Sequence, residues 1–319
     1  MQISASAPTK IILCGEHYVV YGAPALTLPV DMRTYVSVRR SGRMEIIAQT
    51  GNRIINDETI ERGVKAIVGH ICPNEKLRVE LKYSDAPKGM GNSASSSAAL
   101  SLALFSLVGK KPTYEELFNA VQEAEKIAHG SPSGIDAHTV IVGKPTIFRR
   151  FSERKFSEFS FALPNGTTLM VVDTSRGKTC STADMVRRFA EKHGIFKKPE
   201  EMGERERRDV FAEYERIWEK MSKALSDGDA AAIGKTMLDN HALLRKSGVA
   251  SDGIERAVEL CMENGAYGAK LTGAGGEGGA VIALAGNSDV DAIIKAAKNM
   301  GFNAFPISIA DRGVSLEND

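Results

Sequence analysis

Apolar and polar positions follow two periods along the first part of the chain. Short apolar runs, and stretches that alternate at every second residue, predict strands because successive side chains of a strand face opposite sides. These strands are expected at 10–14, 25–30, 33–39, 44–49 and 77–83. Apolar residues at Ile60, Val64, Ile67 and Ile71 recur instead at helical spacing within 57–72. The beginning is therefore predicted to be strand-rich, with one inserted helix.

The remainder of the chain mixes helices with fewer strands. Apolar residues recur at helical spacing over 114–129, 210–221, 230–244, 252–264 and 290–300. Strands are expected at 146–150, 156–163, 168–173, 280–284 and 303–309. The densely charged stretch 197–209 is interpreted as the solvated surface of a helix. A turn at 164–166 suggests a boundary between a domain at 1–165 and a second at 166–319.

Composition excludes several classes of protein. The chain has 319 residues, of which 43% are hydrophobic and 25% are charged, so it is not disordered, fibrous or a coiled coil. No apolar run reaches the roughly 18 residues of a membrane span, and the first residues lack a signal-peptide pattern, so no membrane is expected as a partner. The net charge of +1 gives no electrostatic reason to expect a nucleic-acid partner.

The four cysteines indicate a reducing compartment. Cys14, Cys72, Cys180 and Cys261 lie far apart and form no C-x-x-C pair. In a chain of this length they are expected to be free thiols of a cytoplasmic protein. A zinc site would need clustered ligands and is not expected.

Two glycine-rich segments resemble nucleotide motifs but fail the required context. The segment 228–236 has five residues between its glycines where a P-loop has four, and its Ala-rich interior favours a helix. A G-x-G-x-x-G pattern occurs at 273–278, but an apolar strand follows it where a dinucleotide site needs a helix. Neither a P-loop nor a Rossmann site is predicted.

The segment 87–99, PKGMGNSASSSAA, has a different character. Two glycines are followed by Asn92 and a run of Ser and Ala that enters an apolar segment of helical type. A loop that opens a helix directs backbone N–H groups and the positive end of the helix dipole at an anion. The serine hydroxyls add donors and a candidate magnesium ligand, since magnesium bound with a nucleotide needs only one or two protein oxygens. We interpret this segment as a phosphate-binding loop and not as a surface linker.

Two further segments are ambiguous when each is taken alone. Lys10 lies beside an apolar run in APTKIILCGEHYVVYG at 7–22, and a lysine there is usually a solvated strand end. Asp136 ends the loop GSPSGID at 130–136, where an aspartate usually caps a helix or forms a turn.

Taken together, these segments resemble the GHMP kinases, the superfamily of galactokinase, homoserine kinase, mevalonate kinase and phosphomevalonate kinase. Three motifs of that family occur in order, at 7–22, 87–97 and 270–279, the last with Glu277 in place of a glycine. Within the family the chain looks most like the archaeal and eukaryotic mevalonate kinases. That likeness rests on CGEHYVVYG at 14–22, HGSPSGID at 129–136 and the segment 301–314.

The resemblance implies an α+β fold and an enzyme. The N-terminal domain would be similar to domain 2 of ribosomal protein S5, and the C-terminal domain would be ferredoxin-like. ATP and the acceptor would bind between them, and magnesium would bridge the β- and γ-phosphates. The expected reaction is transfer of the γ-phosphoryl group to the 5-hydroxyl of mevalonate, in the mevalonate pathway of isoprenoid biosynthesis. A homodimer is common in the family.

The resemblance also assigns roles to individual residues. Asp136 would face the acceptor hydroxyl as general base or electrostatic partner, and Lys10 would favour the alkoxide. Ser95 and Glu125 fall at the magnesium-ligand positions. Glu16, His17 and Thr182 fall near the acceptor-binding positions, and Gly273 and Ala274 close around the transfer region. The ATP loop would comprise Pro87, Gly89, Gly91, Asn92, Ser93, Ala94, Ser95 and Ser96.

Besides Glu277, the chain departs from the family pattern at four positions. Thr9 replaces a glycine, and in the second motif Asn92 replaces Leu, Ser93 replaces Gly and Ala94 replaces Ser. Loss of the glycine at 93 restricts the backbone, so Ser96 and Ser97 stay open as alternative magnesium ligands. Phosphomevalonate, another isoprenoid alcohol, homoserine and a sugar stay open as acceptors. A non-catalytic metabolite-binding regulator on the same fold is the alternative from a different class.

Overall fold

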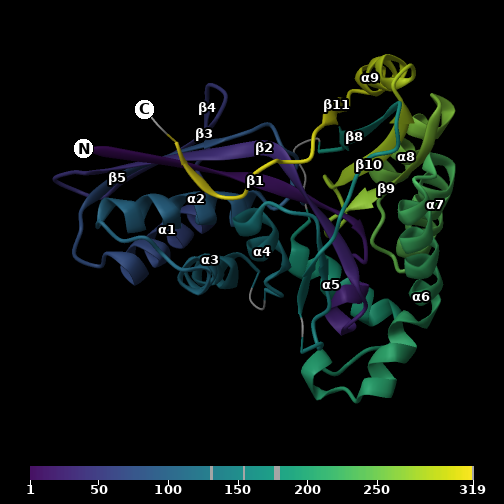
Figure 1. Ribbon diagram of the computed structural model, residues 1–319, viewed down its shortest axis with the longest axis horizontal. Helices are drawn as coiled ribbons and strands as arrows, with labels where there is room; N and C mark the ends of the chain where they lie inside the picture. Colours follow the sequence, from purple (N-terminus) through teal and green to yellow (C-terminus); the bar gives the residue numbers. More distant parts are fainter. Residues whose placement is uncertain (130–131, 154, 176–179, 318–319) are drawn as a thin grey trace.

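Two β-sheets, joined by a long first strand, organise the chain (Figure 1). The computed structural model describes residues 1–129, 132–153, 155–175 and 180–317. The N-terminal strand runs along the first sheet and ends against the second, and the last described residues, 315–317, lie beside the beginning of that strand (Figure 1). None of the helices formed by the described residues combines the length and the apolar character that crossing a membrane requires.

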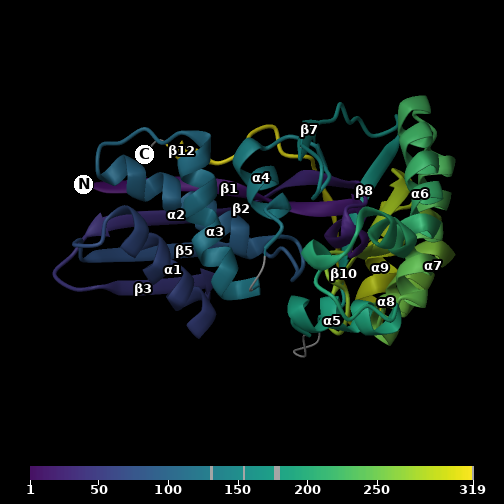
Figure 2. The ribbon, with the colours of Figure 1, turned by 90° about the horizontal axis from the view of Figure 1, so that it is seen from below.

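The first sheet is mainly antiparallel and has the strand order β12-β1-β2-β5-β3-β4, with β6 paired to β2 and β7 to β6. Its strands are β1 (Gln2–Cys14), β2 (Ala25–Arg40), β3 (Glu45–Thr50), β4 (Arg53–Ile54), β5 (Leu77–Tyr83), β6 (Thr146–Phe148), β7 (Phe156–Glu158) and β12 (Ser315–Glu317). Its helices are α1 (Glu58–Ile71), α2 (Asn92–Leu107), α3 (Tyr114–His129) and α4 (Ile135–Val142), with a short 3-10 turn η1 (Tyr18–Tyr21) after β1. Seen from below, these four helices lie over one face of the sheet (Figure 2).

The second sheet is antiparallel throughout, in the order β11-β8-β10-β9. Its strands are β8 (Thr167–Asp173), β9 (Ala266–Thr272), β10 (Ala280–Gly286) and β11 (Asn303–Ile307). Its helices are α5 (Thr182–Lys192), α6 (Glu204–Asp227), α7 (Ala230–Lys246), α8 (Asp252–Glu263) and α9 (Val290–Asn299), with a 3-10 turn η2 (Pro199–Glu201). In sequence order the strands are arranged 4-1-3-2, the order of a ferredoxin-like sheet. The α+β prediction is thus confirmed.

The hydrophobic cores do not divide at the turn at 164–166. One core contains residues of the second sheet and its helices together with Ile11, Leu13 and Tyr18 from the beginning of the chain. A second core fills the space between the first sheet and α1–α4. The end of β1 is therefore anchored in both halves of the molecule, and the residues it carries are held at their junction.

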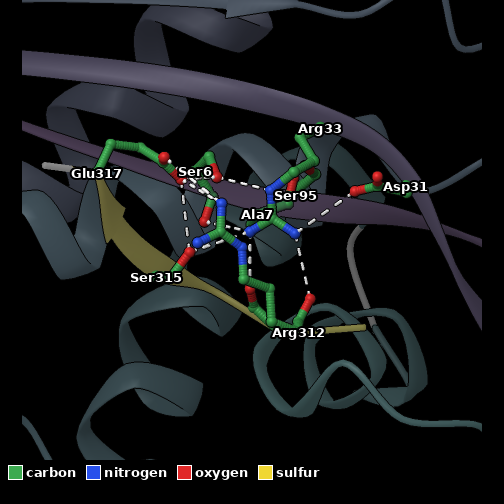
Figure 3. Close-up of polar contacts among 9 residues, drawn as sticks. Ser6, Ala7, Asp31, Arg33, Ser95, Arg312, Ser315 and Glu317 are labelled. Atoms are coloured by element: carbon green, nitrogen blue, oxygen red, sulfur yellow. Dashed lines mark hydrogen bonds and ion pairs between the residues drawn. The ribbon is translucent and has the colours of Figure 1, made fainter. Parts of the chain in front are cut away.

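The last described residues return to the first sheet. The predicted second domain, 166–319, therefore includes residues that pack with the first half of the molecule. Ile309 bridges to Val30, and β12 pairs with β1 through Ser6 and Ser315. Arg33, which is only 7% exposed, donates hydrogen bonds to Ser6 and to the carbonyls of Arg312 and Gly313 (Figure 3). This guanidinium fastens the returning segment to β1 and β2.

Candidate active site

Lys10 and Asp136 form an ion pair at the junction of the two halves. Lys10 is on β1, just beyond a register shift between Ala7 and Thr9 of the β1–β2 pairing. Its Nζ lies 3.1 Å from Oδ1 of Asp136, and their side chains are 3% and 26% exposed. Asp136 is in the first turn of α4, where the helix dipole favours a negative charge. A buried ammonium thus lies against a carboxylate that solvent can reach.

The glycine-rich loop of 87–91 wraps around this lysine. The backbone N–H of Lys10 donates to the carbonyl of Met90 at 2.8 Å, and its Nζ lies 3.4 Å from the carbonyl oxygen of Gly89. Gly91 has φ 76°, and a Cβ there would come within 3.0 Å of the Lys10 side chain, so a glycine is needed for this approach. The lysine and the loop therefore occupy one site, although 79 positions separate Lys10 from Gly89.

The structure accommodates the two departures from the family motif at Asn92 and Ser93. Helix α2 begins at Asn92, so Ser93 has helical backbone and needs no glycine. The Nδ2 group of Asn92 donates to the carbonyls of Ala86 and Pro87 at 3.0 and 3.2 Å, which ties the loop to the helix start. The loop therefore still leads directly into a helix N-terminus, as the phosphate-site interpretation requires.

The third glycine-rich segment meets the second at backbone level. A Cβ at Gly273 would lie 2.6 Å from the carbonyl oxygen of Gly89, a distance that only a glycine avoids. Ala274 accepts a 2.9 Å hydrogen bond from Nε2 of His17. Burial lowers the pKa of His17 to about 4, so at neutral pH this imidazole is neutral and carries its proton on Nε2. His17, Gly273 and Ala274 are thus brought beside the phosphate loop.

Glu125 of α3 joins the same group. Burial, and then the nearby Asp136, raise the pKa of Glu125 to about 7, while a hydrogen bond with Ser93 and the charge of Lys10 act in the opposite direction. Two carboxylates, one ammonium and one hydroxyl therefore face a common space. Because a cation between the carboxylates would relieve their repulsion, this cluster suits a hard divalent ion with oxygen ligands.

Ser95 is directed elsewhere, which changes the predicted metal ligand. Its hydroxyl is completely buried and donates to the carbonyl of Ala7 at 2.8 Å (Figure 3). Residues two apart in a helix lie on opposite sides, so Ser93 and Ser95 cannot both face Glu125. Ser96 donates to the carbonyl of Ser93. The serine that reaches Glu125 is therefore Ser93. Had the helix been predicted to begin at Asn92, its periodicity would have placed Ser93 and Ser95 on opposite sides.

Glu16 occupies a different environment from a free acceptor-binding carboxylate. It is buried in an ion pair with Lys270 of β9, whose side chain is also fully buried. The sequence reasoning missed this lysine, although it begins the third motif. Its partner lies 254 positions away, and no local pattern links them.

Thr182 begins α5, a helix that the sequence pattern did not predict. This helix packs on the third motif, where a Cβ at Gly276 would meet Met185, and its Phe189 stacks on His17 at 5.2 Å. Residues 176–179 and residues 130–131 of the 129–136 motif lie outside the described ranges. Thr182 is half-buried at the near end of the described helix.

Across the described ranges, no three His, Cys, Asp or Glu side chains gather in a way that would hold a metal ion by themselves. A metal that arrives with a nucleotide needs fewer protein ligands, because phosphates and waters complete its shell. One carboxylate and one hydroxyl, from Glu125 and Ser93, meet that smaller requirement.

Comparison with known proteins identifies close counterparts for both halves. The model of the GHMP kinases N terminal domain matches residues 58–144, and that of the GHMP kinases C terminal domain matches residues 221–303. Mevalonate kinase from Aeropyrum pernix is 30% identical over 98% of this chain and 98% of its own length. Mevalonate kinase from Pyrococcus abyssi is 31% identical over 99% of this chain and 98% of its own length.

Solved structures give the same result. The mevalonate kinase of L. major, crystallised with R-mevalonate, superposes with a TM-score of 0.79 at 25% identity, over 96% of this chain and 95% of that one. Lactococcus lactis galactokinase superposes with a TM-score of 0.73 at 18% identity, over 98% of this chain and 95% of that one, and shows the shared fold alone.

Proposed function

The chain belongs to the GHMP kinase family, and on that premise we propose that it is an ATP-dependent mevalonate kinase that phosphorylates the 5-hydroxyl group. The observation that carries the proposal is the Lys10–Asp136 ion pair, enclosed by two glycine-rich loops. The choice of mevalonate is supported by the names of full-length relatives at 30–31% identity.

Lys10 and Asp136 act on the acceptor hydroxyl. An ammonium 3.1 Å from the carboxylate stabilises negative charge as it develops on the attacking oxygen. Asp136 accepts the hydroxyl proton as general base or, while remaining ionised, orients the acceptor and Lys10 electrostatically. Lys10 is buried and Asp136 is partly exposed, so the acceptor reaches the pair from the side of Asp136 in our proposal.

The N-terminus of α2 receives the phosphates of ATP. Gly89 and Gly91 allow close approach of the backbone, and the unpaired N–H groups at the beginning of the helix bind anionic oxygens. Glu125 and Ser93 would hold the magnesium ion, in place of the Ser95 assignment. When bound, magnesium neutralises charge on the β- and γ-phosphates.

The acceptor lies on the side of His17 and Ala274, under α5. The orientation of His17 is held by its hydrogen bond to Ala274 and by the stacked ring of Phe189. Thr182 at the beginning of α5 faces the same region in our proposal. We extend the proposal to a cytoplasmic enzyme of isoprenoid biosynthesis, supported by the four free thiols of the described residues.

A phosphoryl-transfer assay tests the proposal. The protein is incubated with ATP, magnesium and, in separate reactions, mevalonate, phosphomevalonate, homoserine and galactose, and products are identified by phosphorus NMR. A 5-phosphate on mevalonate alone is the expected result. Phosphate on another acceptor or another hydroxyl would reassign the pocket. Bound ATP without transfer to any acceptor would favour the non-catalytic regulator.

Ser93→Ala and Ser95→Ala are expected to have opposite effects. Loss of the Ser93 hydroxyl should raise the magnesium concentration for half-maximal rate about tenfold while leaving the unfolding temperature unchanged. Loss of the Ser95 hydroxyl should leave the magnesium requirement unchanged but destabilise the fold by about 1–3 kcal/mol, since the Ala7 carbonyl loses its buried donor. Magnesium titrations and thermal melts of both variants check this, and the reverse pattern would return the metal to Ser95.

A further inference from the structure

Lys270 is a charged side chain with no contact to solvent. It leaves β9 in the second half of the molecule and ends among atoms of the first strand, with an exposed fraction of 0%. Its Nζ donates to the carboxylate of Glu16, to the carbonyl of Leu271 at 2.6 Å and, at 3.5 Å, to that of Ile12. All three N–H groups of the ammonium thus have acceptors.

Glu16 depends on this lysine for its charge. Its side chain is fully buried; one oxygen is paired with Lys270, and the other has no hydrogen-bond partner among the residues that the structure describes. Burial raises the pKa of Glu16, whereas Lys270 and, more weakly, Lys10 lower it. A buried carboxylate without a cation beside it would take up a proton.

The same strand connects this pair to the reacting groups. Lys10 of β1 contacts Asp136, and Glu16, two residues after the end of β1 at Cys14, contacts Lys270 of β9. Thr272, two residues after Lys270, also binds the backbone of Ile12, at 2.9 Å to its N–H and 3.1 Å to its carbonyl. Lys10 is two residues before Ile12, so β9 holds the strand that carries it.

We propose that Lys270 is a positioning residue for phosphoryl transfer: its ion pair with Glu16, together with the contacts of Lys270 and Thr272 with Ile12, fixes β1 against β9, so that Lys10 is presented to Asp136. This inference rests on the proposed kinase function and deepens it. It also gives Glu16 a role through Lys10 in place of direct contact with the acceptor.

Several titratable groups surround the Glu16–Lys270 pair. Glu16 is faced by Cys14 and Lys10 from β1, by Tyr214 from α6 and by Lys270 from β9. His241 of α7 lies near Lys270, and burial lowers its pKa to about 4. Burial raises the pKa of Cys14 to about 11 and raises the pKa of Tyr214 well above its usual value of 10. Cys14, Tyr214 and His241 therefore do not titrate near neutral pH.

The decisive variant neutralises both partners. Lys270→Met alone leaves a buried carboxylate unpaired and is expected to unfold easily, so its activity is not informative. The double variant Glu16→Gln/Lys270→Met removes both charges with little change in volume and is expected to fold with a melting temperature near that of the wild type. The matched control is Glu213→Gln/Lys246→Met, the same two substitutions at an exposed pair 2.9 Å apart.

We expect kcat of the double variant to fall about 100-fold, with KM for ATP and mevalonate within about threefold of wild type. The control should retain wild-type kcat. Glu16→Gln alone keeps a hydrogen-bond acceptor for Lys270 and so leaves β9 joined to β1. Its kcat should fall less than that of the double variant, again without a change in KM.

Three outcomes overturn the inference. One is a folded double variant with wild-type kcat, which would make the pair purely structural. Another is a rise in KM for mevalonate alone, which would return Glu16 to acceptor binding. If the double variant does not fold, wild-type kcat in Glu16→Gln has the same meaning. A wild-type protein that transfers no phosphate would instead refute the proposed function, so the two failures are distinct.

Discussion

Asp136→Ala and Lys10→Met are each expected to lower kcat by about two to four orders of magnitude, the range for a positioned acid–base or charge-stabilising group. The carboxylate and ammonium lie 3.1 Å apart, and both act on the hydroxyl oxygen as its proton leaves. Because the two groups act as a unit, the double variant should be little slower than either single variant. Non-additivity is therefore part of the expected result.

The measurement is single-turnover phosphoryl transfer, with ATP affinity determined separately by calorimetry. Asp136 is 26% exposed, so its truncation should leave the fold intact and ATP binding within a few-fold of wild type. Lys220→Met serves as the control, because it removes a lysine from an exposed pair with Asp239. An Asp136→Ala protein with full rate, or a double variant whose losses multiply, would remove the pair from the reaction.

From the sequence we could name residues that lie together in the candidate site, but not which side chains contact each other. Lys10, Asp136, Glu125, His17 and Ala274 were all named, and the structure brings them together. Ser95 was assigned as a metal ligand from its position in the family motif, whereas in the structure its hydroxyl donates to the Ala7 carbonyl. Once the run is known to be helix from Asn92, its 3.6-residue period directs alternate serines to different surroundings.

Several elements escaped prediction for identifiable reasons. The first residues of β1 are mostly small or polar, and the contacts that help to bury them come from elsewhere in the chain: Arg33 from β2, and β12 from the end of the described chain. Helix α4 has eight residues with apolar side chains on most sides, so it shows no amphipathic period. The strand predicted at 156–163 is confined to Phe156–Glu158. Local patterns cannot report contacts between residues that are hundreds of positions apart.

Glu125 is expected to make metal binding depend on pH. Its pKa of about 7 has burial as its main cause and Asp136 as the next. A metal binds the ionised carboxylate, so protons compete with it below pH 7. The magnesium concentration for half-maximal rate should therefore rise about tenfold for each pH unit below about 6.5, and be constant above about 7.5. Glu125→Gln should need far more magnesium and lose this pH dependence.

Stability provides a readout that does not require turnover. A carboxyl whose pKa is raised on folding contributes stability that is present below its usual pKa of 4.5 and is lost as pH rises through about 7. The wild type without metal should therefore lose about 3 kcal/mol relative to Glu125→Gln between pH 4 and 8, following the 1.36 kcal/mol per pKa unit of linkage. Magnesium with ATP should restore much of that loss in the wild type at pH 8 but not in the variant. If stability changes with pH in the same way in the wild type and in Glu125→Gln, with and without magnesium, the metal is bound by other ligands. The reason is that only a carboxylate that titrates in this range can link proton release to metal binding.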